Sequence, residues 1–260
     1  MAVVQIEEKD YVLWLTIDRP QQRNAMNEEV LVQLAAGIRQ AEASSHVRAV
    51  VMTGAGERAF CAGGDLKSAT DGKSVFSGNA AKDHDLVALF KEVERCNVPI
   101  IGRINGHALG GGLGLLCMCD LAVGVRNIRV GTPEAKVGLF PMIILGYMLR
   151  VIPRRKLMEL ALTAEPWDGV RAHEEGLLNF VAETRLEMDE YLDKLLTRIV
   201  ANSPTAVRMG KKAIHAIQDM DLDNAFEYAQ LMIEKISKTE DAREGIAAFT
   251  EKRGPRWTGS

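Results

Sequence analysis

The chain has 260 residues, of which 47% are hydrophobic and 26% charged, and its formal net charge is −3. This composition supplies enough apolar side chains for a large buried core, so it excludes general disorder. The Lys and Arg residues are scattered and the charge balance is mildly acidic, which argues against a nucleic-acid surface that neutralises phosphates.

Local features exclude three further classes. Residues 1–10 lack the basic and apolar regions of a secretory signal, so no export is expected. The longest apolar stretch, Ala108–Cys119, contains three consecutive glycines and falls well short of the roughly 18 residues of a membrane span. The four cysteines form no Cys-x-x-Cys pair and have no neighbouring histidines, which disfavours zinc and disulfide frameworks. We expect a cytoplasmic protein with reduced, mostly buried thiols, no metal and no membrane contact.

The predicted elements begin as an alternation of strands and helices. Val3–Glu7 and Tyr11–Ile17 are rich in β-forming residues and predict a hairpin. Asn27 can cap a helix that runs to Ser44, and Val47–Thr53 follows as a strand. The next elements are a helix over Asp85–Arg95, a strand over Val98–Ile104, a glycine-led helix from Gly111 and a strand over Leu121–Val125. This order is typical of an α/β fold with parallel strands and helical crossovers.

The pattern becomes helical after Pro153. The predicted helices are Arg154–Leu162, Met188–Ala201, Pro204–Met220 and Leu222–Thr250, and no strong strand follows Val181. We therefore expect an α/β core over residues 1–200 and a C-terminal helical region over residues 201–260. The Ser-, Gly- and Asn-rich segment Lys67–Lys82 is predicted to be a loop, either one that shapes the substrate site or a tolerated surface insertion.

Two glycine clusters each follow a predicted strand. In Ala62-Gly63-Gly64 the missing side chains let the backbone approach a ligand closely, although for a glycine pair alone a plain turn is the favoured explanation. Gly110-Gly111-Gly112 opens an apolar helix, whose first N–H groups and dipole attract an anion. The spacing matches neither G-x-G-x-x-G nor a P-loop, so nucleotide-binding interpretations fail.

A single carboxylate follows, in Thr132-Pro133-Glu134 ahead of Gly138-Leu139-Phe140-Pro141. Between proline and apolar residues this carboxylate is expected to be partly desolvated, which raises its pKa and suits it to proton transfer. The alternative is a solvated glutamate near a helix start, which is the commoner role of such a residue.

Together these segments resemble the enoyl-CoA hydratase/isomerase (crotonase) superfamily. The shared motifs are, in order, Phe-Cys-Ala-Gly-Gly-Asp-Leu, Asn-Gly-x-Ala-x-Gly-Gly-Gly, Cys-Asp-x-Ala and Pro-Glu-x-x-x-Gly-x-x-Pro. The likeness continues to Phe249-x-Glu251-Lys252-Arg253 and covers nearly the whole chain. It implies an acyl-CoA substrate, a core of ββα spiral turns, and a C-terminal helical trimerisation region that assembles a homotrimer or a hexamer made of two trimers.

The resemblance also implies roles for individual residues. The amides of Gly64 and Gly111 match the family's two oxyanion-hole donors, and Glu134 matches a catalytic carboxylate. The implied coenzyme A-binding residues are Arg23, Ala25, Ala62, Leu66, Phe249 and Lys252. Phe249 and Lys252 match residues that often reach the nucleotide from a neighbouring subunit, and their alternatives are core packing and an exposed charge. Asp65 is interpreted as a hydrogen-bonding residue that organises its loop, and His107 as a residue that packs or bonds to the backbone and is not a base. No cofactor beyond the coenzyme A moiety is implied.

One carboxylate of the hydratases is missing. Hydratases of this family usually place two glutamates around one water; Glu134 matches the second, and Gly114 stands at the position of the first. One base and one oxyanion hole suffice to carry a proton between C2 and C4, so we favour a Δ3,Δ2-enoyl-CoA isomerase-like activity. The alternatives are a 2-enoyl-CoA hydratase of fatty-acid or branched acyl-CoA degradation, and a non-catalytic acyl-CoA-binding homologue. Met142–Leu145 replaces the Gly-x-Gly-Gly that relatives often carry, which indicates either an apolar acyl pocket or helix packing.

Overall fold

The computed structural model describes residues 2–65 and 84–260, so the predicted loop Lys67–Lys82 lies outside the described residues. The main sheet has six strands in the order β1-β2-β3-β5-β7-β10. They are β1 (Val4–Lys9), β2 (Val12–Ile17), β3 (Ala49–Gly54), β5 (Ile100–Ile104), β7 (Leu121–Val125) and β10 (Phe180–Ala182). β1 and β2 form the predicted antiparallel hairpin, and the other neighbouring strands pair in parallel.

A second, smaller sheet positions the glycine clusters. Its strands are β4 (Ala59–Cys61), β6 (His107–Leu109), β8 (Arg129–Gly131) and β9 (Trp167–Asp168), in that order. β3, β5 and β7 of the main sheet each lead into one of the parallel strands β4, β6 and β8. The repeated pair of strands, one in each sheet, confirms the crotonase-like ββα spiral.

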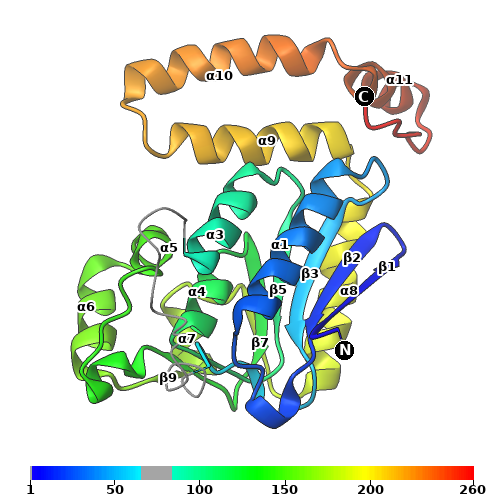
Figure 1. Cartoon of the computed structure of the whole chain (residues 1–260). Helices are drawn as coiled ribbons and strands as arrows, with labels where there is room; N and C mark the ends of the chain where they lie inside the picture. The colour runs from blue at the N-terminus through cyan, green and yellow to red at the C-terminus, as the bar shows by residue number, and fades with distance from the viewer. Residues whose placement is uncertain (1, 66–83) are drawn as a thin grey trace.

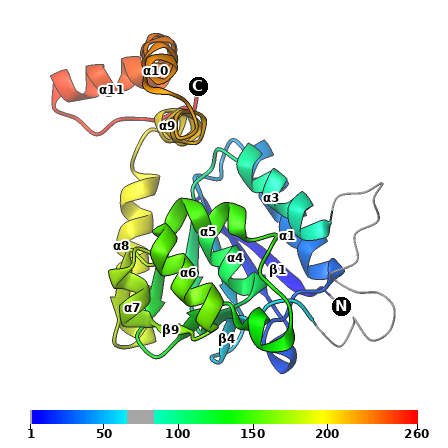
Figure 2. The same ribbon diagram turned by 90° about the vertical axis from the view of Figure 1, so that its left-hand side faces the viewer.

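Helices cover both faces of the main sheet. Figures 1 and 2 show α1 (Glu28–Ala43) and α3 (Asp85–Arg95) on one face and α8 (Arg185–Val200) on the other. The side chain of Asn27 accepts a hydrogen bond from the Val30 N–H, which begins α1 where the sequence predicts it. β3 is buried over its whole length because the sheet is covered on both sides.

The remaining helices are short pieces around the second sheet and three longer ones at the C-terminus. They are η1 (Pro20–Gln22), α4 (Gly111–Cys117), η2 (Pro133–Val137), α5 (Leu145–Val151), α6 (Arg154–Thr163), α7 (Gly169–Glu174), α9 (Pro204–Ile217), α10 (Leu222–Ser237) and α11 (Glu240–Glu251). Figure 2 shows α9, α10 and α11 standing beyond the end of α8, on one side of the body. Within residues 2–65 and 84–260, no helix is long and apolar enough to cross a bilayer.

The prediction of one continuous helix over Leu222–Thr250 is wrong. α10 ends at Ser237, and Thr239 begins α11 by accepting a hydrogen bond from the Ala242 N–H. A threonine followed by two acidic residues is a strong helix start, and here this local signal outweighs the helical periodicity on either side of it.

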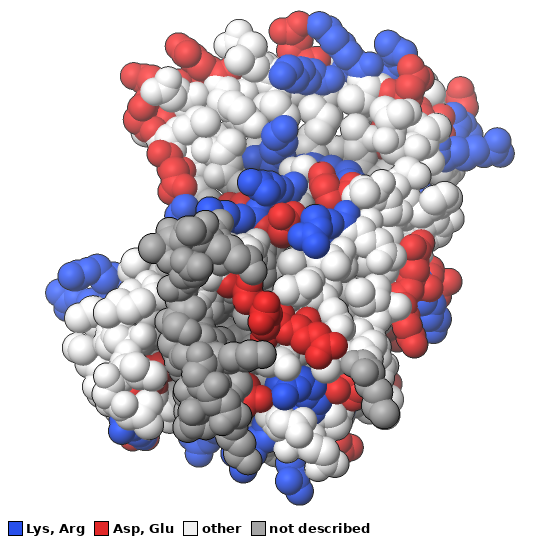
Figure 3. Space-filling model, viewed as in Figure 1, with Lys and Arg blue, Asp and Glu red and all other residues white. Residues whose placement is uncertain are grey.

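The cysteines and the surface charges agree with the composition. All four cysteines are free thiols, three of them buried, and burial raises the pKa of Cys61 to about 12. Such thiols are weak nucleophiles at neutral pH. On the face seen in Figure 3, Lys and Arg side chains are interspersed with Asp and Glu on both the core and the C-terminal helices.

Candidate active site

The two glycine clusters meet at the carboxyl ends of β4 and β6. These strands pair in parallel, so the segments that follow them emerge side by side. A methyl group added to Gly63 would lie 3.4 Å from the Gly111 nitrogen, and one added to Gly111 would lie 3.8 Å from the Gly64 nitrogen. Gly63 has φ +98°, which strains any other residue. The structure therefore brings the amides of Gly64 and Gly111 to one place.

Both amides are available to a ligand. Gly111 is the first residue of α4, where a helix leaves its N–H groups without partners. Gly64 forms an isolated parallel bridge with Met26. In it, the Met26 N–H donates to the Gly63 carbonyl oxygen and the Asp65 N–H donates to the Met26 carbonyl oxygen, both at 2.8 Å. Within the described residues, the protein offers no hydrogen-bond acceptor to the N–H of Gly64 or of Gly111.

A largely buried ion pair links Asp65, which follows the Gly63-Gly64 cluster, to Arg19 in the segment before α1. Asp65 Oδ2 accepts from Arg19 Nη2 at 3.0 Å, and both side chains are largely buried, with 17% and 15% exposed. The same guanidinium donates through Nη1 to the Ala25 carbonyl oxygen. Arg19 thus fixes the peptide that carries Gly64, and Asp65 organises the loop as the sequence indicated.

Glu134 faces the glycine clusters from η2, the short helix that begins at Pro133. Its Oε1 lies 2.9 Å from where a methyl group on Gly110 would stand, so only glycine leaves room for this carboxylate. Oε2 is buried and has no hydrogen-bond partner among the described residues. Burial raises the pKa of Glu134, and a hydrogen bond from its own backbone N–H partly offsets this rise. The carboxylate is therefore partly desolvated, as the sequence predicts, and is not a solvated helix cap.

Glu134 and the glycines line one cavity of about 410 Å³. Most of the remaining lining is apolar: Met26, Leu31, Leu86, Val137, Leu139, Phe140, Met142, Ile143 and Ile144. Such a cavity fits an apolar chain next to the Glu134 carboxylate, and His84 also lines it. The apolar segment Met142–Leu145, which the sequence left open between an acyl pocket and helix packing, contributes to this wall.

The space beside Gly114 is filled. A methyl group on Gly114 would lie 2.3 Å from Ile144 Cγ2 and 3.4 Å from Phe90 Cζ, and Ile144 is only 2% exposed. No larger side chain fits at position 114 unless Ile144 moves. Sequence reasoning found the glycine but missed Ile144 as its partner, because the two residues lie 30 positions apart.

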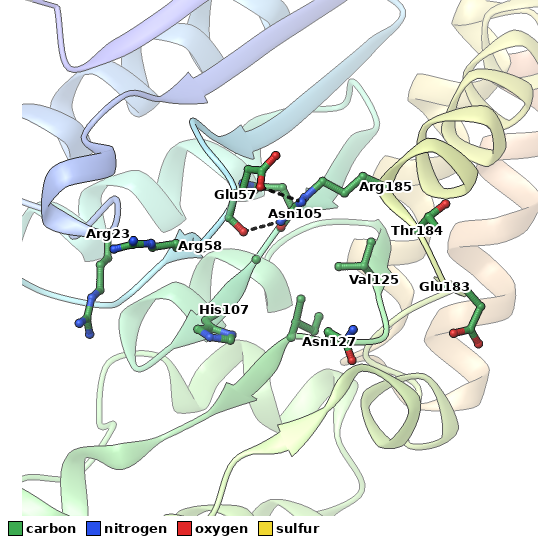
Figure 4. A pocket seen from close by; sticks show the side chains of 12 residues that line it. Arg23, Glu57, Arg58, Asn105, His107, Val125, Asn127, Glu183, Thr184 and Arg185 are labelled. Carbon is green, nitrogen blue, oxygen red and sulfur yellow. Dashed lines mark hydrogen bonds and ion pairs between the residues drawn. The ribbon is translucent and has the colours of Figure 1, made fainter.

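The other predicted residues divide between several places. Ala62 lines the cavity, and Ala25 is buried directly before Met26. Arg23 lines a second pocket (Figure 4), and Glu134 is not among the lining residues of that pocket. Phe249 is 88% exposed on α11, and Lys252, also exposed, ends that helix; neither lines the cavity.

Leu66, Asp65's neighbour in the sequence, lies outside the described residues. His107 Nδ1 accepts a hydrogen bond from the Arg129 N–H at 3.0 Å, which confirms its predicted bond to the backbone. The described residues contain no group of His, Cys, Asp and Glu that could hold a metal ion.

Comparison with known proteins identifies the family. The model of the enoyl-CoA hydratase/isomerase family matches residues 7–260. The chain belongs to this family. A putative enoyl-CoA hydratase of Thermus thermophilus is 32% identical over 259 residues, which cover 98% of this chain and 100% of the relative. A 2,3-dehydroadipyl-CoA hydratase of Escherichia coli is 29% identical over 264 residues, covering 100% of both.

Solved structures of enoyl-CoA hydratases share this fold over the whole chain. The crystal structure of an enoyl-CoA hydratase from Mycobacterium marinum matches with a TM-score of 0.89 and 35% identity, and covers 100% of both chains. Members of the enoyl-CoA hydratase/isomerase family are lyases and isomerases, and this chain is an enzyme of that family.

Proposed function

We propose that this enzyme interconverts 3-enoyl-CoA and 2-enoyl-CoA thioesters, with Glu134 as the single acid/base. The observation that carries the proposal is that Ile144 fills the space beside Gly114, which a second carboxylate at position 114 would need. Adding water requires a nucleophile to be held and activated, whereas moving one proton along the acyl chain requires one base.

The proposed reaction has two proton transfers. The thioester oxygen accepts hydrogen bonds from the N–H groups of Gly64 and Gly111, and Glu134 removes a proton from C2. The C–H electrons form the enolate, whose charge rests on the thioester oxygen and extends to C4 through the C3–C4 double bond. Glu134 then returns the proton to C4, which leaves the double bond between C2 and C3. Each N–H donor is worth roughly 3–4 kcal/mol in the transition state.

The burial of Glu134 supports both steps. A carboxylate with a raised pKa is a stronger base once ionised, and it holds the proton more firmly between the two transfers. The apolar lining supports an apolar acyl chain as substrate. In this proposal the coenzyme A moiety of the substrate is the only cofactor, and Arg23, Ala25 and Ala62 contribute to its binding.

Hydration of 2-enoyl-CoA is the second candidate. The names of the relatives favour it, since the proteins of Thermus thermophilus and Escherichia coli are both called hydratases. In this case Glu134 alone would have to activate the water. The missing second glutamate and the bulk of Ile144 weigh against that arrangement.

Incubation with a 3-enoyl-CoA and, separately, a 2-enoyl-CoA distinguishes the candidates. Isomerisation leaves the mass unchanged and shifts the double bond, whereas hydration adds one water, so chromatography with mass detection separates the products. We expect the 3-enoyl substrate to convert first to the 2-enoyl product. Hydration without isomerisation would contradict the proposal. Acyl-CoA binding without any α-proton exchange in deuterium oxide would instead favour a non-catalytic binder.

We further propose that the C-terminal helices assemble a homotrimer or a hexamer. Large apolar side chains, each more than half exposed, lie on α9, α10 and α11: Ile214, Leu222, Phe226, Leu231, Ile233, Ile246 and Phe249. Large apolar side chains exposed in this number are typical of protein interfaces. In such an assembly Phe249 and Lys252 would reach the coenzyme A of a neighbouring subunit, and light scattering measures the number of subunits.

A further inference from the structure

Helices α3 and α5 lie next to each other (Figures 1 and 2), and both reach the wall of the Glu134 cavity. Leu86 lines the cavity from the first turn of α3, and Ile144 lines it from the position directly before α5. Both side chains are buried. The placement of the two helices relative to each other therefore sets how much room the cavity has on this side.

One face of α3 is turned toward α5. Leu86, Phe90 and Glu94 follow one another at intervals of four residues, which places them on the same face of the helix. The Phe90 ring lies 3.4 Å from the position of a methyl group on Gly114, which Ile144 also contacts. Glu94, one turn further along, contacts α5. This face of α3 thus runs from the cavity, past the space beside Gly114, to a polar contact at its far end.

Tyr147 makes that contact from α5. Its hydroxyl donates a hydrogen bond to Glu94 Oε1 at 2.6 Å, and its ring packs edge-on against Phe90, with 4.8 Å between the ring centroids. Burial raises the pKa of the Tyr147 hydroxyl, and the hydrogen bond to Glu94 raises it further, so the group remains a donor at neutral pH. Hydrogen bonds to carboxylates are shorter and stronger than those between neutral groups. Tyr147 therefore joins α5 to α3 through one polar and one aromatic contact.

Tyr147 is also linked directly to Ile144. The Tyr147 N–H donates to the Ile144 carbonyl oxygen at 3.2 Å, so the two residues belong to one hydrogen-bonded turn and move together. α5 also forms an ion pair between Arg150 and Asp219, but these side chains are 41% and 61% exposed, and exposed pairs contribute little. Met148 is fully buried and keeps α5 packed on the core whether or not Tyr147 retains its hydroxyl.

We infer that Tyr147 and Glu94 are positioning residues for Ile144, and that they make the cavity select straight acyl chains over methyl-branched ones. The inference rests on the proposed acyl-CoA site and adds a substrate class to it. With the hydrogen bond in place, Ile144 fills the space beside Gly114 that a branch would need. Without it, Ile144 can withdraw and leave room for the branch. One methylene group in an apolar pocket changes discrimination by roughly 10–200-fold, so a small displacement of Ile144 is measurable.

Calorimetric titration with butanoyl-CoA and with 3-methylbutanoyl-CoA tests the inference. We expect the unmodified protein to bind the straight chain more tightly. In Tyr147→Phe the ratio of the two dissociation constants should fall by about threefold to tenfold, the factor that one hydrogen bond contributes. Tyr191→Phe is the matched control and should keep the ratio. Tyr191 lies on α8, outside the cavity, and its hydroxyl forms no hydrogen bond within the described residues.

Further variants identify the route by which Tyr147 acts. Glu94→Gln keeps an acceptor oxygen for the hydroxyl and should retain the ratio, whereas Glu94→Ala should lower it as Tyr147→Phe does. Ile144→Ala removes the side chain that Tyr147 positions, so adding Tyr147→Phe to that variant should lower the ratio no further. Thermal unfolding of each variant checks that it remains folded.

Three results would overturn the inference. An equal ratio in Tyr147→Phe and in the unmodified protein, even with lower thermal stability, would show that Tyr147 only supports the fold. A further fall of the ratio in the double variant would show that Tyr147 does not act through Ile144. Equal binding of both thioesters by the unmodified protein would show that Ile144 does not limit the acyl chain. Both thioesters are saturated, so these outcomes do not depend on whether Glu134 catalyses isomerisation or hydration.

Discussion

The two walls of the Glu134 cavity differ in what they contribute. One wall consists of backbone: Gly63, Gly64, Gly110 and Gly111 add no side chain, and within the described residues the N–H groups of Gly64 and Gly111 have no acceptor. The opposite wall consists of apolar side chains, of which Met26, Leu31 and Ile144 are almost fully buried. The first wall can stabilise a developing negative charge, and the second removes water from the carboxylate between them.

The contrast shows that the two walls contribute through backbone and volume, and the charged group of the cavity is the Glu134 carboxylate. The backbone wall requires glycine because neighbouring atoms approach it too closely for a side chain: a methyl group on Gly111 would lie 2.4 Å from Met26 Cε. The apolar wall is specified by volume, because Ile144 fits only against a glycine at 114. Changes to either wall should therefore alter the reaction in different ways, and the predictions below separate the two contributions.

The largest effect is expected from the carboxylate between the walls. Glu134→Gln keeps the shape of the side chain and removes the base, so α-proton exchange in deuterium oxide should fall by about 10²–10⁴-fold. Binding of the acyl-CoA should change little, because the thioester oxygen contacts the glycine wall. Exchange that survives in Glu134→Gln would show that another group is the base.

The second effect isolates the glycine wall. Gly111→Ala pushes Met26 against the site of the thioester oxygen and displaces one N–H donor, so kcat should fall by roughly 10²–10³-fold. Gly210→Ala is the matched control, because a methyl group on this glycine in α9 meets no atom within 4 Å. That control should retain full activity, and it should gain roughly 0.5–1 kcal/mol of stability from improved helix propensity. Equal kcat in both variants would remove Gly111 from the reaction.

The third effect isolates the apolar wall. Gly114→Ala overpacks the space that Ile144 fills, which should lower the free energy of unfolding by roughly 1–3 kcal/mol. Ile144→Ala opens that space, so the two changes together should cost less than the sum of the single changes. Chemical denaturation of the four proteins measures this coupling, and additive costs would show that the two positions do not share the space.

The same pair of positions tests the choice of reaction. In the Ile144→Ala background, Gly114→Glu places a second carboxylate where hydratases of the family carry one, and hydration of 2-enoyl-CoA should rise relative to isomerisation. Gly114→Glu alone should fail to do so, because Ile144 occupies the room. Full hydratase activity of the unmodified protein, with no gain in the double variant, would favour the hydratase alternative.

The elements with strong local signals could be predicted from the sequence. Asn27 begins α1 as predicted, and the two glycine clusters and Glu134 meet where the resemblance places them. The strands of the smaller sheet were missed because two or three residues are too short to show a period. The contact between Gly114 and Ile144 and the ion pair between Arg19 and Asp65 join distant segments, so only the folded chain shows them.

The smallest effect concerns stability and has a definite sign. Burial raises the pKa of Glu134 in the folded protein, so the folded state holds this proton at pH values where the unfolded chain has released it. Stability is therefore lost as pH rises through the folded-state pKa, and Glu134→Gln should avoid that loss. The variant should match the stability of the unmodified protein well below pH 4.5, the ordinary Glu pKa, and exceed it at neutral pH.

Glu159 provides a comparison of opposite sign. It lies exposed on α6, and a hydrogen bond from Arg171 lowers its pKa. Glu159→Gln should therefore lose a little stability at neutral pH and none at low pH, whereas Glu134→Gln gains stability. Urea denaturation of both variants across this pH range measures the two differences. If Glu134→Gln were less stable than the unmodified protein at neutral pH, the carboxylate would have a stabilising partner, and the apolar wall would not desolvate it.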